Sequence, residues 1–139
     1  MKNQPNDIVT LEWLLPLFNQ QLSQISDGWQ LGNDSTNYEQ MVKNYHQVGG
    51  ALTMIRLPLL ADLANKLSLL VEASGHDNIS INNSRIGQFA HRLLERELNQ
   101  YMRTTSHNTT LINNAANDLT QALSDLGIAT ETLAASQHT

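Results

Sequence analysis

The sequence predicts an all-α fold, an antiparallel up-down bundle of about five helices. Apolar residues recur at helical spacing in five separate segments. Strand signals are missing, because neither alternating β-branched residues nor regularly spaced Gly/Pro turns occur. The connections between the segments are short, as is typical of helical bundles.

The first helix is expected over about 9–25, and Pro16 either kinks it or divides it into two helices. Asp27-Gly28 is expected to end it, with Trp29 and Leu31 packing just beyond. Its apolar stripe is Leu11, Leu14, Leu15, Phe18, Leu22 and Ile25.

The second helix is expected to begin near 33–36, where Thr36 and Glu39 have the spacing of a capping box. Pro58 suits the first turn of a third helix, and Ser74-Gly75 is a plausible end for it. The two apolar stripes are Met41, Val42, Tyr45, Val48, Leu52 and Ile55, then Leu60, Leu63, Ala64, Leu67, Leu70 and Val71.

The fourth helix is expected to begin around 82–84, and a polar loop over 104–110 separates it from the fifth. Gly127 is expected to end the fifth helix. The predicted buried faces are Ile86, Phe89, Ala90, Leu93, Leu94, Leu98 and Tyr101, then Ile112, Ala115, Ala116, Leu119, Ala122, Leu123 and Leu126.

The 139 residues are enough for one domain with a buried core, which we place at 1–128. The small polar segment 129–139 is expected to be a flexible tail or the start of a linker. Hydrophobic residues make up 40% and charged residues 15%, which argues against a disordered tail or a coiled coil. The apolar runs are short and the first residues polar, so we expect a cytoplasmic domain without membrane insertion.

The charge and residue types exclude several functions. The net charge is -5 and the eight Lys and Arg residues form no basic stripe, so nucleic acid is not an expected partner. The chain has no cysteine, which rules out thiolate metal sites and thiol nucleophiles. Neither a nucleophile elbow nor a glycine-rich phosphate loop occurs, so we expect no cofactor and no catalytic activity of the chain's own.

Four of the five histidines offer no clear chemistry. His76, His107 and His138 lie in predicted loops or the tail, where they are solvated polar residues. His91 and Glu95 are one turn apart on the fourth helix, and we interpret them as a surface pair. A metal site in a bundle needs more carboxylates with Glu-x-x-His spacing, so no metal is expected.

His46 differs because two glycines follow it within the segment "YHQVGGALTM". Each glycine within a helix costs roughly 1 kcal/mol relative to alanine. Gly49 and Gly50 lie one turn after His46, so they clear the surface beside the imidazole for a partner. The alternative interpretation is that these glycines let a second helix pack closely.

These residues resemble the signature of histidine phosphotransfer domains, which such a bundle also suits. The match comprises His46, Val48, Gly50, Ala51, Met54 and Ile55. Gly49 stands where the family has lysine, and Leu52 where it has a small residue.

A closer resemblance covers roughly the first half of the chain. "LEW" at 11–13, "YHQVGGALTMI" at 45–55 and "LLADLANKLSLLVEA" at 59–73 look like the N-terminal domain of CheA-like hybrid histidine kinases that control type IV pili. They also look like a related scaffold protein. The resemblance implies a module of a two-component phosphorelay in twitching motility, within a larger sensor kinase.

The resemblance implies that His46 accepts a phosphoryl group. A histidine kinase core would supply that group, and a response-regulator receiver domain would take it. The docking face would include Lys43, Gln47, Gly49, Gly50 and Thr53. Lys43, one turn before His46, could partly replace the missing lysine. The alternative is a degenerate, unphosphorylated scaffold that docks protein partners.

Overall fold

Five α-helices make up almost all of the chain that the computed structural model describes, namely residues 4–31, 35–74, 81–104, 106 and 108–128. They are α1 (Gln4–Leu31), α2 (Ser35–Met54), α3 (Pro58–Ser74), α4 (Ile81–Thr104) and α5 (Thr109–Asp125). No strand occurs in these ranges, which confirms the all-α prediction. The predicted tail at 129–139 and His76, His107 and His138 lie outside the described residues.

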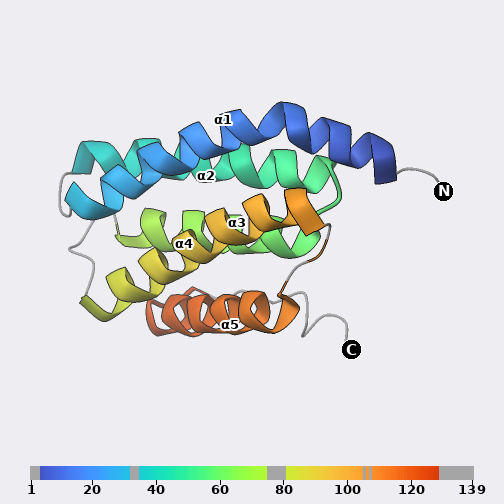
Figure 1. Cartoon of the computed structure of the whole chain (residues 1–139). Helices are drawn as coiled ribbons and strands as arrows, with labels where there is room; N and C mark the ends of the chain where they lie inside the picture. Colours follow the sequence, from blue (N-terminus) through green and yellow to red (C-terminus); the bar gives the residue numbers. More distant parts are fainter. Residues whose placement is uncertain (1–3, 32–34, 75–80, 105, 107, 129–139) are drawn as a thin grey trace.

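The helices form a bundle with α3 near its centre. In Figure 1, α1 and α2 lie along one side of the molecule, α5 lies on the opposite side, and α3 and α4 lie between them. The most extensive helix–helix contact joins α2 and α3, and α3 also packs against α4 and α5. None of the described helices is both long and apolar enough to cross a bilayer.

The core follows the helical stripes read from the sequence. All six predicted stripe residues of α3 are completely buried, and burying one leucine side chain is worth about 1.5–3 kcal/mol. On α1, Phe18, Leu22 and Ile25 are buried. Four-residue spacing places such side chains on one side of each helix, where they meet the neighbouring helices.

The predicted end of the first helix at Gly28 is wrong. The helix α1 passes through both Pro16 and Gly28 and ends at Leu31. Its last turns are anchored by Trp29, whose ring is buried and whose indole N–H donates to the Tyr45 hydroxyl at 2.9 Å. Tertiary packing thus outweighs the local stop signal. Pro16 itself is exposed.

The predicted buried face of α4 is partly wrong. Phe89 is 54% exposed, whereas the neighbouring Ala90 and His91 are buried. The core-facing stripe of α4 runs through positions 87, 90, 91, 94 and 98, and Phe89 lies outside it. Leu126, predicted on the buried face of the fifth helix, is 44% exposed and lies just after the end of α5 at Asp125.

Two helices end in the Schellman arrangement, with one residue in the left-handed region. After α5 this residue is Gly127, with φ 87°, and Ile128 N–H donates to the Leu123 carbonyl at 2.8 Å. After α2 it is Arg56, with φ 67°, and Leu57 N–H donates to the Leu52 carbonyl at 2.9 Å. The tight turn at Arg56 leads directly to Pro58, which begins α3 as predicted.

The start of α5 is fixed by two polar side chains. The Asn108 side chain accepts from the backbone N–H of Leu111 at 3.1 Å and caps the helix. The backbone N–H of Asn108 donates to the buried Glu97 carboxylate of α4 at 2.7 Å. For α2, which begins at Ser35, the predicted capping box depends on the Thr36 side chain, outside the described part of the chain.

Candidate functional site

The candidate site lies on α2, where Tyr45 and His46 point in different directions although they are adjacent in the sequence. A helix turns by about 100° per residue, because it has 3.6 residues per turn. Tyr45, Val48 and Leu52 are therefore completely buried against the core. His46, one residue after Tyr45, is exposed on the outer side of the helix. The imidazole is therefore accessible to solvent.

The two glycines after His46 have different surroundings. A Cβ at Gly50 would meet nothing within 4 Å, so this position is open space. A Cβ at Gly49 would lie 2.4 Å from the Asn65 Oδ1 atom of α3, because Gly49 is buried between the two helices. The two glycines therefore differ: a side chain at position 49 would meet the end of the Asn65 side chain, whereas one at position 50 would meet nothing. Gly49 admits the Asn65 side chain, and Gly50 leaves the surface bare.

The His46 ring is held by α3. Its Nε2 atom lies 3.1 Å from the hydroxyl oxygen of Ser68, a residue with no exposed surface. Ser68 is on the same side of α3 as Asn65, which lies one turn earlier and faces Gly49. Sequence reasoning missed Ser68, because a single serine between Leu67 and Leu69 carries no signal of a partner on another helix.

The remaining predicted site residues lie along the same side of α2. Lys43, Gln47 and Thr53 are exposed, whereas Gly49 is the one buried member of the predicted set. The Gln47 side chain accepts a hydrogen bond from Gln21 of α1. The Thr53 hydroxyl donates to the carbonyl of Gly49 at 2.9 Å, within its own helix. The exposed stripe thus runs between α1 and α3, with His46 on the α3 side.

The prediction that His91 belongs to a surface pair is wrong. His91 is 1% exposed, and its Nδ1 atom lies 2.8 Å from the Tyr45 hydroxyl. The indole N–H of Trp29 can only donate, so the Tyr45 oxygen accepts from it at 2.9 Å. Tyr45 then donates its own proton to Nδ1, which places the ring proton of neutral His91 on Nε2. This buried hydrogen-bond network joins α1, α2 and α4.

Burial also determines which side chains of this hydrogen-bond network are charged. Desolvation lowers the pKa of His91 to about 4 and raises the pKa of Tyr45 above its usual range. His91 Nε2 has no hydrogen-bond partner within the described ranges, and the nearest carboxylate oxygen, on Glu95, is 3.8 Å away. His91 is therefore neutral at pH 7 and is a structural residue of the core.

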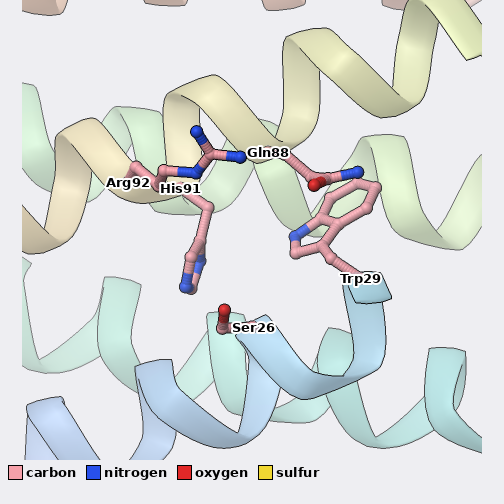
Figure 2. Close-up of a pocket in the computed structure, with 5 residues that line it drawn as sticks. All are labelled: Ser26, Trp29, Gln88, His91 and Arg92. Carbon is pink, nitrogen blue, oxygen red and sulfur yellow. The ribbon is translucent and has the colours of Figure 1, made fainter. Parts of the chain in front are cut away.

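A small cavity adjoins His91 between α1 and α4. Its volume of about 30 Å³ is enough for one water molecule, and its lining is mainly polar. Figure 2 shows the His91 ring directed from α4 toward α1, where Ser26 lies, with the Gln88 amide beside the Trp29 indole. The lining residues are Ser26, Trp29, Gln88, His91 and Arg92. The cavity is too small for an organic substrate.

Neither histidine belongs to a metal centre in the part of the chain that the structure describes. No group of three or more His, Asp and Glu side chains converges there. Comparison with protein-family models, curated proteins and solved structures finds no significant match to this chain.

Proposed function

We propose that this chain is a signalling module of the histidine phosphotransfer type, with its five helices as an antiparallel bundle. His46 accepts a phosphoryl group from a histidine kinase core and passes it to the receiver domain of a response regulator, in a phosphorelay that controls type IV pili. One observation carries the proposal. An exposed imidazole lies in the middle of α2, next to a glycine beside which a Cβ would meet nothing within 4 Å.

Phosphoryl transfer requires little catalytic chemistry from this protein itself. A neutral imidazole nitrogen is a nucleophile for phosphorus. Positioning and electrostatic stabilisation supply most of the catalysis in phosphoryl transfer, and the magnesium ion and acidic residues belong to the partners. The chain itself provides a rigid helix, an accessible ring and an unobstructed approach at Gly50.

Lys43 is the candidate cation for the transferred group. It is exposed and lies three residues before His46, so the two side chains are neighbours on one side of α2. Its ammonium group would attract the negative charge that develops on the transferred phosphoryl group. It would approach from the turn before His46, whereas the lysine of the family lies in the turn after the histidine. Gly49, which stands where the family has lysine, has no side chain for this role.

Labelling with ATP tests the proposal. The chain is incubated with magnesium, radiolabelled ATP and the catalytic core of the CheA-like kinase from the same organism. We expect a phosphate label on this chain that is stable to base and labile to acid, as phosphohistidine is. His46→Gln should abolish it, and Lys43→Gln should reduce it several-fold. His46→Gln replaces one exposed polar side chain by another, so it should fold. The absence of label on the wild type would refute the proposal.

A second candidate function is docking without phosphorylation, and exposed apolar side chains favour it. Trp13 and Leu17 of α1 are 81% and 49% exposed, and Met54 of α2 is 83% exposed. Gln21 pairs with Gln47, and Gln24 with Asn44, so residue numbers rise along α1 as they fall along α2. If the same register continues along the two helices, Trp13 and Leu17 are expected near the end of α2 that carries Met54.

This candidate predicts a partner that binds at Gly50 and the apolar side chains. A pull-down compares the wild type with Gly50→Arg and with Phe89→Arg, which changes an exposed residue of α4. Docking at this face requires Gly50→Arg to lose the partner and Phe89→Arg to keep it. If Gly50→Arg keeps every partner, this face is not the docking surface.

A further inference from the structure

The exposed side of α4 carries half of the lysine and arginine residues of the protein. Four arginines follow one another at spacings of seven, four and seven positions, which places them in one narrow stripe of a helix with 3.6 residues per turn. The stripe is about 27 Å long, because each residue adds about 1.5 Å. The expectation that the basic residues form no stripe is therefore wrong for α4. The members of this arginine stripe, all exposed, are Arg85, Arg92, Arg96 and Arg103.

The arginine stripe is largely unpaired within the described ranges. Arg96, which lies 3.6 Å from the buried Glu97, is the one member with an ion-pair partner there, and the other three have neither an ion pair nor a hydrogen bond. Glu95, the other carboxylate of α4, is partly buried, and its oxygen lies 3.8 Å from His91 Nε2. The stripe therefore presents positive charge to the solvent.

This clustering of charge is unfavourable for the isolated helix. Charged side chains on a solvated helix stabilise it when opposite signs are one turn apart. Arg92 and Arg96 are instead like charges at that spacing, which destabilises a helix. Arg103 has a local explanation, because it lies in the last turn, where the helix dipole favours a cation. Arg85 and Arg92 have no such role in the described fold.

The neighbouring helices confine the positive charge to α4. This helix packs against both α1 and α5, and it lies between them in Figure 1. Neither neighbour contains a lysine or an arginine, whereas both contain acidic residues, including the exposed Asp27, Asp118 and Asp125. The protein as a whole has a net charge of -5. The positive surface is therefore only one helix wide.

We propose that the arginine stripe is a docking surface for an acidic helix of another protein. The partner helix lies along α4 and carries carboxylates at spacings of seven, four and seven positions, so that each guanidinium meets one carboxylate. Arginine binds a carboxylate through two parallel hydrogen bonds, which makes the pairing specific in geometry as well as in charge. This docking is independent of phosphotransfer at His46, which lies on a different helix.

Phe89 favours a protein partner over a nucleic acid or a membrane. Its ring is 54% exposed, and it is one turn from both Arg85 and Arg92 on the surface of α4. Phenylalanine and arginine are both enriched at protein interfaces, where the ring would pack against an apolar side chain of the partner helix. Duplex DNA and an anionic membrane are both wider than one helix, so they would also meet the acidic side chains of α1 and α5.

Binding of a designed peptide tests the proposal. The probe is a fluorescent helical peptide with glutamates at the spacing of the stripe and a leucine beside them, and its control has glutamine in place of every glutamate. Fluorescence anisotropy is measured in about 150 mM salt, which largely screens exposed charges more than about 8 Å apart. We expect saturable binding of the glutamate peptide and none of the glutamine peptide. The amide signals that shift in a proton–nitrogen NMR titration should lie on α4.

Two double variants of equal charge separate the stripe from the net charge. Arg85→Gln with Arg92→Gln changes the stripe, whereas Lys43→Gln with Arg56→Gln changes two exposed cations elsewhere. Each exposed ion pair contributes little, so we expect the first pair to weaken binding by about tenfold and the second by less than about twofold. Phe89→Ser should weaken binding several-fold. All these side chains are exposed, and circular dichroism verifies that each variant is folded.

The other possible occupants are tested in parallel. Tighter binding of a short DNA duplex or of phosphatidylserine vesicles than of the glutamate peptide would overturn the assignment to a protein partner. Self-association in sedimentation experiments that is lost with Arg85→Gln and Arg92→Gln would assign the stripe to a second copy of this chain instead. Equal weakening by the two double variants, or no binding of the glutamate peptide, would refute the docking role of the stripe. None of these outcomes bears on the phosphate label at His46.

Discussion

Tyr45 and His46 are neighbours in the sequence, yet the Tyr45 side chain faces the core and the His46 side chain faces solvent. Tyr45 is completely buried and links Trp29 of α1 to His91 of α4, whereas His46 is exposed and its Nε2 atom lies 3.1 Å from the Ser68 hydroxyl of α3. The core network therefore fixes the rotation of α2 about its axis. That rotation is what directs His46 outward.

Removal of the Tyr45 hydroxyl should destabilise the fold. Tyr45→Phe leaves the Trp29 N–H and His91 Nδ1 buried without their hydrogen-bond partner, which we expect to lower the free energy of unfolding by about 2 kcal/mol. Urea denaturation followed by circular dichroism measures this. The control Ser124→Ala removes an exposed hydroxyl and should change stability by less than about 0.5 kcal/mol. Wild-type stability of Tyr45→Phe would show that the network adds nothing.

Stability should fall between pH 6.5 and 4. The pKa of His91 is about 4 in the folded chain and 6.5 as a model value, so below 6.5 the unfolded state binds more protons. The folded state then loses up to about 3 kcal/mol as the pH falls through this window. Burial raises the pKa of Glu95, and its earlier protonation works in the opposite direction and offsets part of the loss.

The measurement compares variants, because other carboxylates also titrate below pH 5. The free energy of unfolding is determined at pH 7, 5.5 and 4 for the wild type, His91→Leu and His46→Gln. We expect His91→Leu to lose most of the decrease and His46→Gln to retain it. An equal decrease in the wild type and His91→Leu contradicts the assignment to His91.

Two glycine-to-alanine changes should have opposite signs. A Cβ at Gly87 would lie 2.4 Å from the Trp29 ring, which is held by its bond to Tyr45, so Gly87→Ala should cost about 2 kcal/mol. Gly50→Ala adds a methyl group in open space within a helix and should raise stability by up to about 1 kcal/mol. Urea midpoints of the two variants provide the comparison. Equal effects of the two substitutions would argue against the close contact at Gly87.

Arg56 should be replaceable by glycine with a gain in stability. Its positive φ of 67° is unfavourable for a residue with a Cβ, and glycine adopts this conformation freely. We expect Arg56→Gly to raise the free energy of unfolding by up to about 1 kcal/mol. Arg56→Ala, which keeps the Cβ, should give no such gain. Thermal melts of both variants test this.

The sequence was sufficient for the elements whose signals are local. The helix α3 was predicted from start to end, because Pro58 suits its first turn and its apolar stripe is regular. Gly28 was misinterpreted because the residue that extends α1 past it, Trp29, depends on Tyr45 sixteen positions away. The sequence left open whether the surface beside His46 is bare or covered by a second helix, because the glycine pair is compatible with both.

Long-range partners were the part that the sequence could not reveal. His91 and Glu95 are four positions apart, which is also the spacing of an exposed ion pair on a helix. The burial of His91 depends on its contact with Tyr45, which lies on another helix. Ser68 likewise becomes important only when α3 packs against α2. A periodic pattern identifies the side of a helix that faces the core, but it does not identify the residue on the facing helix.

The short turn at Arg56 has a consequence for the order of folding. His46 and Ser68 are separated by only 22 positions, and the turn between their helices closes with its own hydrogen bonds. Bringing such near neighbours together costs little chain entropy compared with joining α1 to α4, where Asn19 and Asn99 are 80 positions apart. We therefore expect α2 and α3 to form an early helical hairpin, with the serine–histidine pair assembled before the ends of the chain dock.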